Sequence, residues 1–104
     1  MKNKTIKRYM TVGIQKEIPP ELQFFLWELQ INKRKESENF DYLQIYSLLR
    51  LSSSLQAIEH TAEVPKHHDV YYIETAKPID SKVYIITDEY EDCLVETMLF
   101  PSER

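Results

Sequence analysis

The side chains best suited to hold a metal ion lie in one short polar segment. His67, His68 and Asp69 are consecutive, and His60 and Glu63 precede them by a few positions. Zinc requires three or four converging ligands, whereas adjacent side chains on an extended segment point to opposite sides. The two earlier residues would have to reach the site from a neighbouring strand. We therefore predict surface histidines in a loop at 65–69 and no metal site.

Two kinds of side chain could act as nucleophiles, Cys93 and the serines at 52–54. A reactive cysteine needs a base or positive surroundings, but Cys93 follows Glu91 and Asp92. We interpret the cysteine as a small buried side chain and the serines as turn residues. The acidic segment at 88–92 reads as a solvated turn, because it lacks the glycine and the terminal glutamate of an EF-hand. The sequence therefore predicts no catalytic residue.

The composition excludes several broad classes of protein. The chain has 104 residues, a length that suits one domain spanning 1–104. Its single cysteine cannot form an internal disulfide, and its single glycine, Gly13, excludes the glycine-rich loops that bind nucleotide phosphates. A net charge of −4 argues against a general nucleic-acid binder. We see no signal peptide and no run of about 18 apolar residues, so we expect a cytoplasmic protein without a cofactor.

The hydrophobic pattern predicts an α+β fold. Prolines at 19–20 fit the first turn of a helix that continues to about residue 36. Residues 42–51 fit a strand or a helix, and their Tyr and Ile content favours a strand. Further strands are predicted at 5–14, 55–64, 70–76, 82–88 and 93–100. The expected architecture is one N-terminal helix packed on a twisted, mainly antiparallel sheet of about five to six strands.

The predicted helix carries apolar residues on two sides. At 100° per residue, one stripe follows core spacing: Leu22, Phe25, Leu26 and Leu29. A second stripe lies nearly opposite: Phe24, Trp27 and Ile31. Exposed apolar patches of this kind mark interfaces, and Trp is enriched at binding hot spots. Three covers for the second stripe remain open: other parts of the same chain, a second copy in a homodimer, or an unknown protein partner or ligand.

Three sequence segments resemble a small domain family of unknown function from staphylococci, related low-GC Gram-positive bacteria and their phages. The first segment begins with Arg8, Tyr9, Thr11 and Gly13; the second contains Ile18, Pro19, Glu21, Leu22, Gln23, Phe25 and Trp27; the third is Asp41, Tyr42, Leu43 and Gln44. The resemblance implies an α+β fold, which supports the strand at 42–51, and a cytoplasmic bacterial or phage setting. It brings no activity and no catalytic residue. The family's Met-rich last strand and acidic tail are matched more loosely.

We carry three functional hypotheses forward. The first is a non-enzymatic protein-interaction domain that self-associates through the second stripe. The second is a small-molecule-binding module or minor enzyme, with a pocket between helix and sheet lined by Tyr9, Tyr46, Tyr72 and Trp27. The third is a phage accessory protein that contacts nucleic acid through basic residues at 2–8 and 33–35, or a nucleic-acid-binding host protein through the acids at 88–92.

Overall fold

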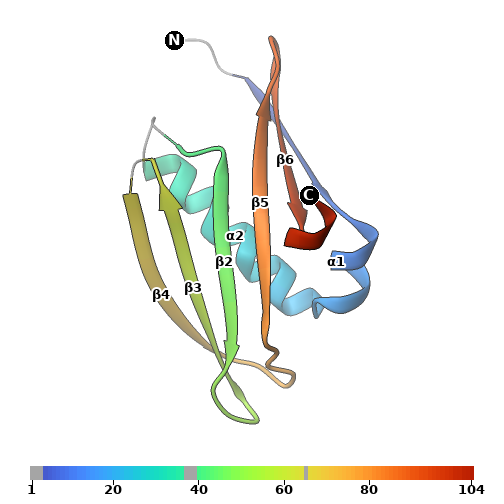
Figure 1. The fold of residues 1–104 in the computed structure, drawn as a ribbon, viewed down its shortest axis with the longest axis vertical. Coiled ribbons are helices and arrows are strands. Elements are labelled where there is room, and N and C mark those ends of the chain that lie inside the picture. The colour runs from blue at the N-terminus through green and yellow to red at the C-terminus, as the bar shows by residue number, and fades with distance from the viewer. Residues whose placement is uncertain (1–3, 37–39, 65) are drawn as a thin grey trace.

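A computed structural model describes residues 4–36, 40–64 and 66–104. Its strands and helices follow one another along the chain as drawn in Figure 1. The elements are β1 (Thr5–Met10), α1 (Val12–Glu17), α2 (Pro20–Glu36), β2 (Leu43–Arg50), β3 (Leu55–Glu63), β4 (Lys66–Glu74), β5 (Ser81–Glu89), β6 (Cys93–Leu99) and the 3₁₀ helix η1 (Pro101–Glu103). The long helix and the strands at 43–50 and 55–63 confirm the assignments made from the pattern.

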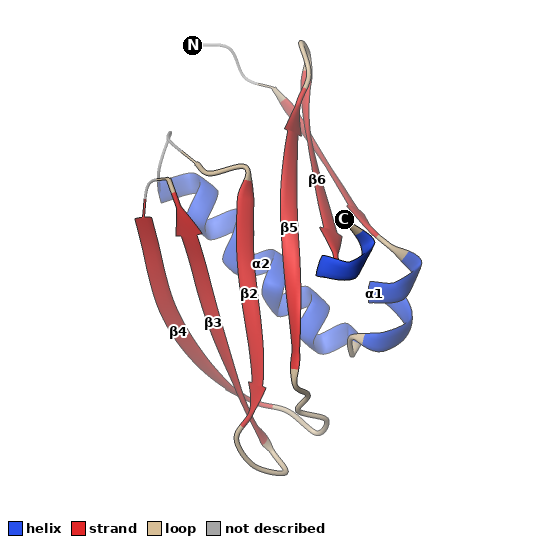
Figure 2. Ribbon diagram, viewed as in Figure 1, coloured by secondary structure: helices blue, strands red, loops and turns tan. Residues whose placement is uncertain are grey.

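The strands form one mixed sheet in the order β1-β6-β5-β2-β3-β4. In the described residues β1 runs parallel to β6, and the four other pairings are antiparallel. The fold is therefore α+β with one main helix on a six-stranded sheet, and Figure 2 shows that helix behind the sheet. An antiparallel meander holds only for β2-β3-β4, because β5 returns to the free side of β2. The main helix follows β1 and α1 and does not open the chain.

Two predicted boundaries differ from the structure. The first strand ends at Met10, because the Thr11 hydroxyl accepts a hydrogen bond from the backbone N–H of Ile14 at 3.2 Å and begins α1. The loop predicted at 65–69 was wrong for residues 66–69, which are the first residues of β4. Polar side chains are tolerated there because β4 is an edge strand. Pro65 lies outside the described residues.

The core lies between α2 and one face of the sheet. In α2, Leu22 and Leu26 are fully buried, while Phe25 and Leu29 pack against the core from its flank. The sheet contributes alternate residues, as period-two alternation requires: Tyr46, Leu48, Ile58, Val83, Ile85 and Met98. Ile14 of α1 joins the same cluster. We call the opposite side of the sheet the open face. No helix in the described ranges is long and apolar enough to cross a membrane.

Candidate functional site

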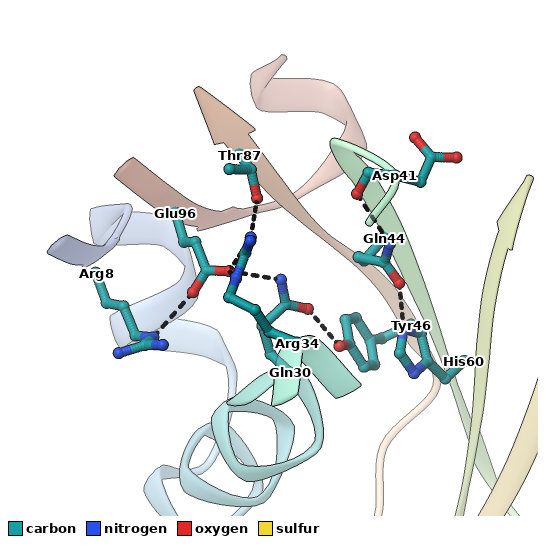
Figure 3. A network of polar contacts seen from close by, with 9 residues as sticks. All are labelled: Arg8, Gln30, Arg34, Asp41, Gln44, Tyr46, His60, Thr87 and Glu96. Carbon is teal, nitrogen blue, oxygen red and sulfur yellow. Dashed lines mark hydrogen bonds and ion pairs between the residues drawn. The ribbon is translucent and has the colours of Figure 1, made fainter. Parts of the chain in front are cut away.

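A carboxylate lies fully buried between the sheet and α2. Glu96 of β6 is 0% exposed, and Figure 3 shows the polar side chains that surround it. The Nε of Arg8 donates to Glu96 Oε1 at 2.9 Å, and the Nε of Arg34 donates to Oε2 at 2.8 Å. The Nη2 of Arg34 lies 2.6 Å from the same oxygen. The Gln30 amide donates to it at 2.9 Å. One buried negative charge is thus held by two guanidinium groups and one amide.

Strand register and helix spacing bring these groups together. Arg8 of β1 is directly opposite Glu96 in the parallel pair, and Thr87 of β5 is opposite it on the other side. Gln30 and Arg34 are four residues apart, so they share one face of α2. Arg34 Nη2 also donates to the Thr87 hydroxyl at 2.9 Å. Three strands and the helix are therefore tied by one polar cluster.

The cluster continues into the middle of the sheet through Tyr46. Its hydroxyl donates to Gln30 Oε1 at 2.6 Å, and its ring stacks on His60 with 4.2 Å between centroids. His60 Nε2 lies 2.6 Å from Gln44 Oε1, and the Gln44 amide donates to the Asp41 carbonyl at 2.9 Å. Because the Gln44 oxygen must accept, His60 carries its proton on Nε2. We call this connected set the polar core (Figure 3); its members are Arg8, Gln30, Arg34, Gln44, Tyr46, His60, Thr87 and Glu96.

Burial fixes the charge states of the two aromatic members of the polar core. Loss of solvation lowers the pKa of His60 to about 3, and the neighbouring His67 and Lys33 act in the same direction. Burial raises the pKa of Tyr46 well above its usual value, and the charge of Glu96 adds to this. Both side chains are therefore neutral at pH 7. Each is paired inside the protein and shielded from solvent, so the polar core has the character of a structural element.

A cavity of about 640 Å³ opens at the ends of β2, β3 and β4. Its lining combines apolar and polar side chains: Asp41, Tyr42, Leu43, Ile45, Thr61, Ala62, Glu63, Val64, Lys66, His67 and His68. The Asp41 carboxylate accepts three backbone N–H groups there, from Leu43, Glu63 and Val64. Burial alone would raise the pKa of Asp41, but these three hydrogen bonds outweigh it and hold the pKa below its usual value. Asp41 therefore has a structural role in the wall of the cavity.

The two adjacent histidines point apart. His68 lies on the open face, where its Nε2 is 2.7 Å from Glu59 Oε2. His67 faces the other side beside His60, and burial lowers its pKa. Its Nε2 is enclosed without a hydrogen bond among the described residues, although Asp69 Oδ2 is 3.2 Å away. Within the described ranges, no three His, Cys, Asp or Glu side chains converge as metal ligands.

The second apolar stripe of α2 is not one continuous surface. Phe24 is 69% exposed, Ile31 is half-buried, and Trp27 packs against the core cluster. The buried arc of α2 is centred on Leu22 and Leu26, which brings Trp27 to its border. The chain itself therefore covers part of this stripe, and Phe24 is its one member that is mainly exposed.

The structure does not assemble the predicted aromatic pocket. Tyr9 lies on β1 and Tyr72 on β4, at opposite edges of the sheet. Both belong to the open face, whereas Tyr46 is buried on the α2 side. Trp27 is on that same side. Each tyrosine lies on a different strand, and side-chain alternation decides which face of the sheet each one occupies. The sequence alone does not show how these strands lie relative to one another.

Most of the basic residues proposed to contact phosphate are engaged by acids of the same chain. Lys4 contacts Glu89 at 2.7 Å, because β1 lies beside the β5-β6 hairpin. Arg8 and Arg34 contact Glu96, and Lys33 lies 3.7 Å from Glu36. Lys2 lies outside the described residues. The interpretation of Cys93 as a buried side chain was wrong, because it is only partly buried at the start of β6, next to the exposed turn residues Glu91 and Asp92.

The polar core was missed in the sequence, although a signal for it exists. Glu96 alternates with Leu94 and Met98 and therefore occupies a core-facing strand position. Gln30 extends the buried stripe of Leu22 and Leu26 by another four residues. A charged side chain on the buried face of a strand needs partners, and the arginines and glutamines of the chain were the available ones.

Two of three comparisons with known proteins give a match. A family model described as a staphylococcal protein of unknown function (DUF960) matches residues 7–103. None of the curated proteins matches. A solved structure of a protein of unknown function from Enterococcus faecalis is similar in fold, with a TM-score of 0.69 and 18% identity. The match covers 94% of this chain and 90% of that one.

Proposed function

The chain belongs to this staphylococcal family of unknown function, and we propose that it is a non-enzymatic protein-interaction domain that self-associates through the open face of its sheet. The occupant of that face is a second copy. The observation that carries the proposal is an apolar sheet surface over which the described residues pack no long helix.

The open face is apolar along much of β2 and β5, while Ser47, Glu59 and His68 add polar groups to its middle. Its central strand, β2, contributes Leu43, Ile45 and Leu49, since the alternate residues of β2 face the core. The strands β5, β6 and β4 add Tyr84, Ile86, Val95, Val70 and Tyr72. Tyr72 is 63% exposed and Val70 is 43% exposed. The η1 helix contacts β5, and Arg104 donates to the Tyr42 hydroxyl at 3.1 Å. The C-terminal residues thus cover only the part of the face near β5.

The charge pattern suits a second copy, and the flat area corresponds to a small interface. The outer open-face positions hold three lysines and three acids, Lys7, Lys66, Lys82, Glu63, Glu74 and Asp88. Such a balanced border lets identical faces approach without net repulsion. Six strands about 4.8 Å apart, with about six residues each, give a flat area of roughly 500 Å² before side-chain relief is added. A standard interface buries roughly 800 Å² of accessible surface per partner.

Replacing Ile45 by glutamate tests this surface. We expect wild-type protein to self-associate in sedimentation and the Ile45→Glu variant to lose the open-face contact, with the Kd of that contact raised at least about tenfold, because a charge would be buried at its centre. Leu49→Glu repeats the test at a more exposed position of the same strand. Sedimentation velocity over a concentration series gives Kd, and the unfolding midpoint verifies that each variant is folded.

Phe24→Glu is the matched control on the outer side of α2. It adds the same charge at an exposed apolar residue and should leave the dimer intact. If Phe24→Glu dissociates the dimer and Ile45→Glu does not, the contact surface is the second stripe of α2 and the open-face proposal is rejected. A wild-type protein that remains monomeric at every concentration would reject self-association itself.

The cavity beside Asp41 supports a second candidate function, the binding of a small molecule. Its volume lies within the range of about 300–1,000 Å³ that is typical of ligand pockets, and it joins an apolar wall to a few polar groups. His67 and His68 sit in its lining and provide NMR reporters. A metabolite screen that shifts their ring signals, and not those of buried His60, would support this function. A screen without such shifts would count against it.

A further inference from the structure

β4 is an edge strand with one side free of pairing among the described residues. It pairs with β3 over its whole length, from Lys66 opposite Glu63 to Glu74 opposite Leu55. Its nine residues contain no proline, and the register with β3 has no bulge. Edge strands are commonly blocked by such devices, because their unpaired N–H and C=O groups template further pairing. β4 does carry charged side chains, which also protect edges, so a strand that docks on its outer side must pair with those charges.

We propose that β4 pairs antiparallel with β4 of a second copy, in a register centred on Val70. This contact rests on the self-association proposed above and adds an edge interface to it. In that register each residue pairs with one equally far beyond the centre. Lys66 is then opposite Glu74 of the partner subunit, and the symmetric pair forms at the other end. Opposite charges directly across strands stabilise a pair.

Neighbouring registers lose this complementarity. A two-residue shift in one direction places Asp69 opposite Asp69 of the partner subunit, and like charges at that position are destabilising. The same shift in the other direction moves Lys66 beyond the end of the partner's β4, so that it has no residue of that strand opposite it. It also places His68 opposite Glu74 of the partner subunit. Among these three face-preserving registers, only the one centred on Val70 pairs every lysine and glutamate of β4.

The edge contact has a defined geometry. In this register even-numbered residues pair with even-numbered residues of the partner subunit. The open faces of the two copies therefore lie on the same side of one continuous sheet, and both α2 helices lie on the other. A two-fold axis perpendicular to the sheet relates the copies, as in an isologous dimer. The exposed Val70 and Tyr72 of each copy come together near this axis. Edge pairing leaves the rest of the open face accessible.

A cysteine at the centre of β4 tests the register. In a Cys93→Ser background, which removes the native thiol, Val70→Cys is expected to form a disulfide-linked dimer under mild oxidation. Directly opposed residues have Cα atoms about 4.5–5.5 Å apart, within the span of a disulfide. Tyr72→Cys in the same background is the control. Its two copies would be about 14 Å apart along the strand and should remain unlinked.

A charge exchange tests the same register without oxidation. Lys66→Glu should weaken the edge contact, and Lys66→Glu with Glu74→Lys should restore it, because the two positions lie at opposite ends of one strand and meet only between copies. Linking at 70 together with this rescue supports the proposal. A dimer in sedimentation that gives no link at 70, or links at 72 instead, overturns edge pairing while self-association stands. A monomeric protein without links rejects both.

Discussion

Replacing Glu96 by glutamine is expected to lower the free energy of unfolding by about 3–5 kcal/mol. The variant removes a charge that is fully buried and leaves Arg8 and Arg34 facing a neutral amide. Breaking a buried ion pair from one side is costly because the two guanidinium groups, whose side chains are only 30% and 17% exposed, lose their partner and regain little water. Urea denaturation followed by tryptophan fluorescence measures the change, since Trp27 packs against the core.

The Lys4–Glu89 pair provides the control. Its nitrogen–oxygen distance, 2.7 Å, is close to those in the polar core, but Glu89 is exposed. Solvent screens such pairs, so Glu89→Gln should leave the unfolding midpoint nearly unchanged. Equal effects of the two substitutions would contradict a structural role for the buried cluster.

A second variant separates the lost pairing from the lost carboxylate. Replacing buried ionic groups together by apolar residues of similar volume is often neutral or stabilising. Glu96→Leu combined with Arg34→Met should therefore be more stable than Glu96→Leu alone. If adding Arg34→Met gives no recovery, the unpaired guanidinium is not the source of the cost.

The local elements of the fold could be predicted from the sequence. The prolines at 19–20 and the basic residues at 33–35 mark both ends of α2, and strand alternation located β2 and β3. These signals are local, because capping, dipole and alternation act within a few residues. The family resemblance was also confirmed over residues 7–103.

Pairing between distant strands could not be predicted in the same way. The parallel contact of β1 with β6 joins Arg8 to Glu96, which is 88 residues away in sequence. The alternation of side chains shows which side of a strand is apolar, but it does not identify the strand that pairs with it. A site whose residues come from two such strands therefore cannot be predicted from the sequence pattern, and the polar core is the main example. The aromatic pocket failed for the same reason.

The last prediction concerns the dependence of stability on pH, which His60 should dominate above pH 5. Folded His60 has a pKa of about 3, whereas an unfolded histidine has a pKa of 6.5. Between these values the unfolded chain binds more protons, so the free energy of unfolding falls as pH falls from 6.5 toward 3. From pH 7.5 to pH 5 the expected loss is about 2 kcal/mol. Carboxylates titrate mainly below this window.

His60→Gln should remove most of this slope, while His68→Gln should retain it. Glutamine can still donate to Gln44 but cannot take up a proton, so the variant is less stable at pH 7.5 and flatter down to pH 5. His68 is 58% exposed on the open face. The slope that remains in His60→Gln belongs to His67, whose pKa burial also lowers. Urea midpoints at half-unit steps of pH test these curves, and a wild-type curve that is flat from pH 7.5 to pH 5 would show that His60 is not buried in its neutral form.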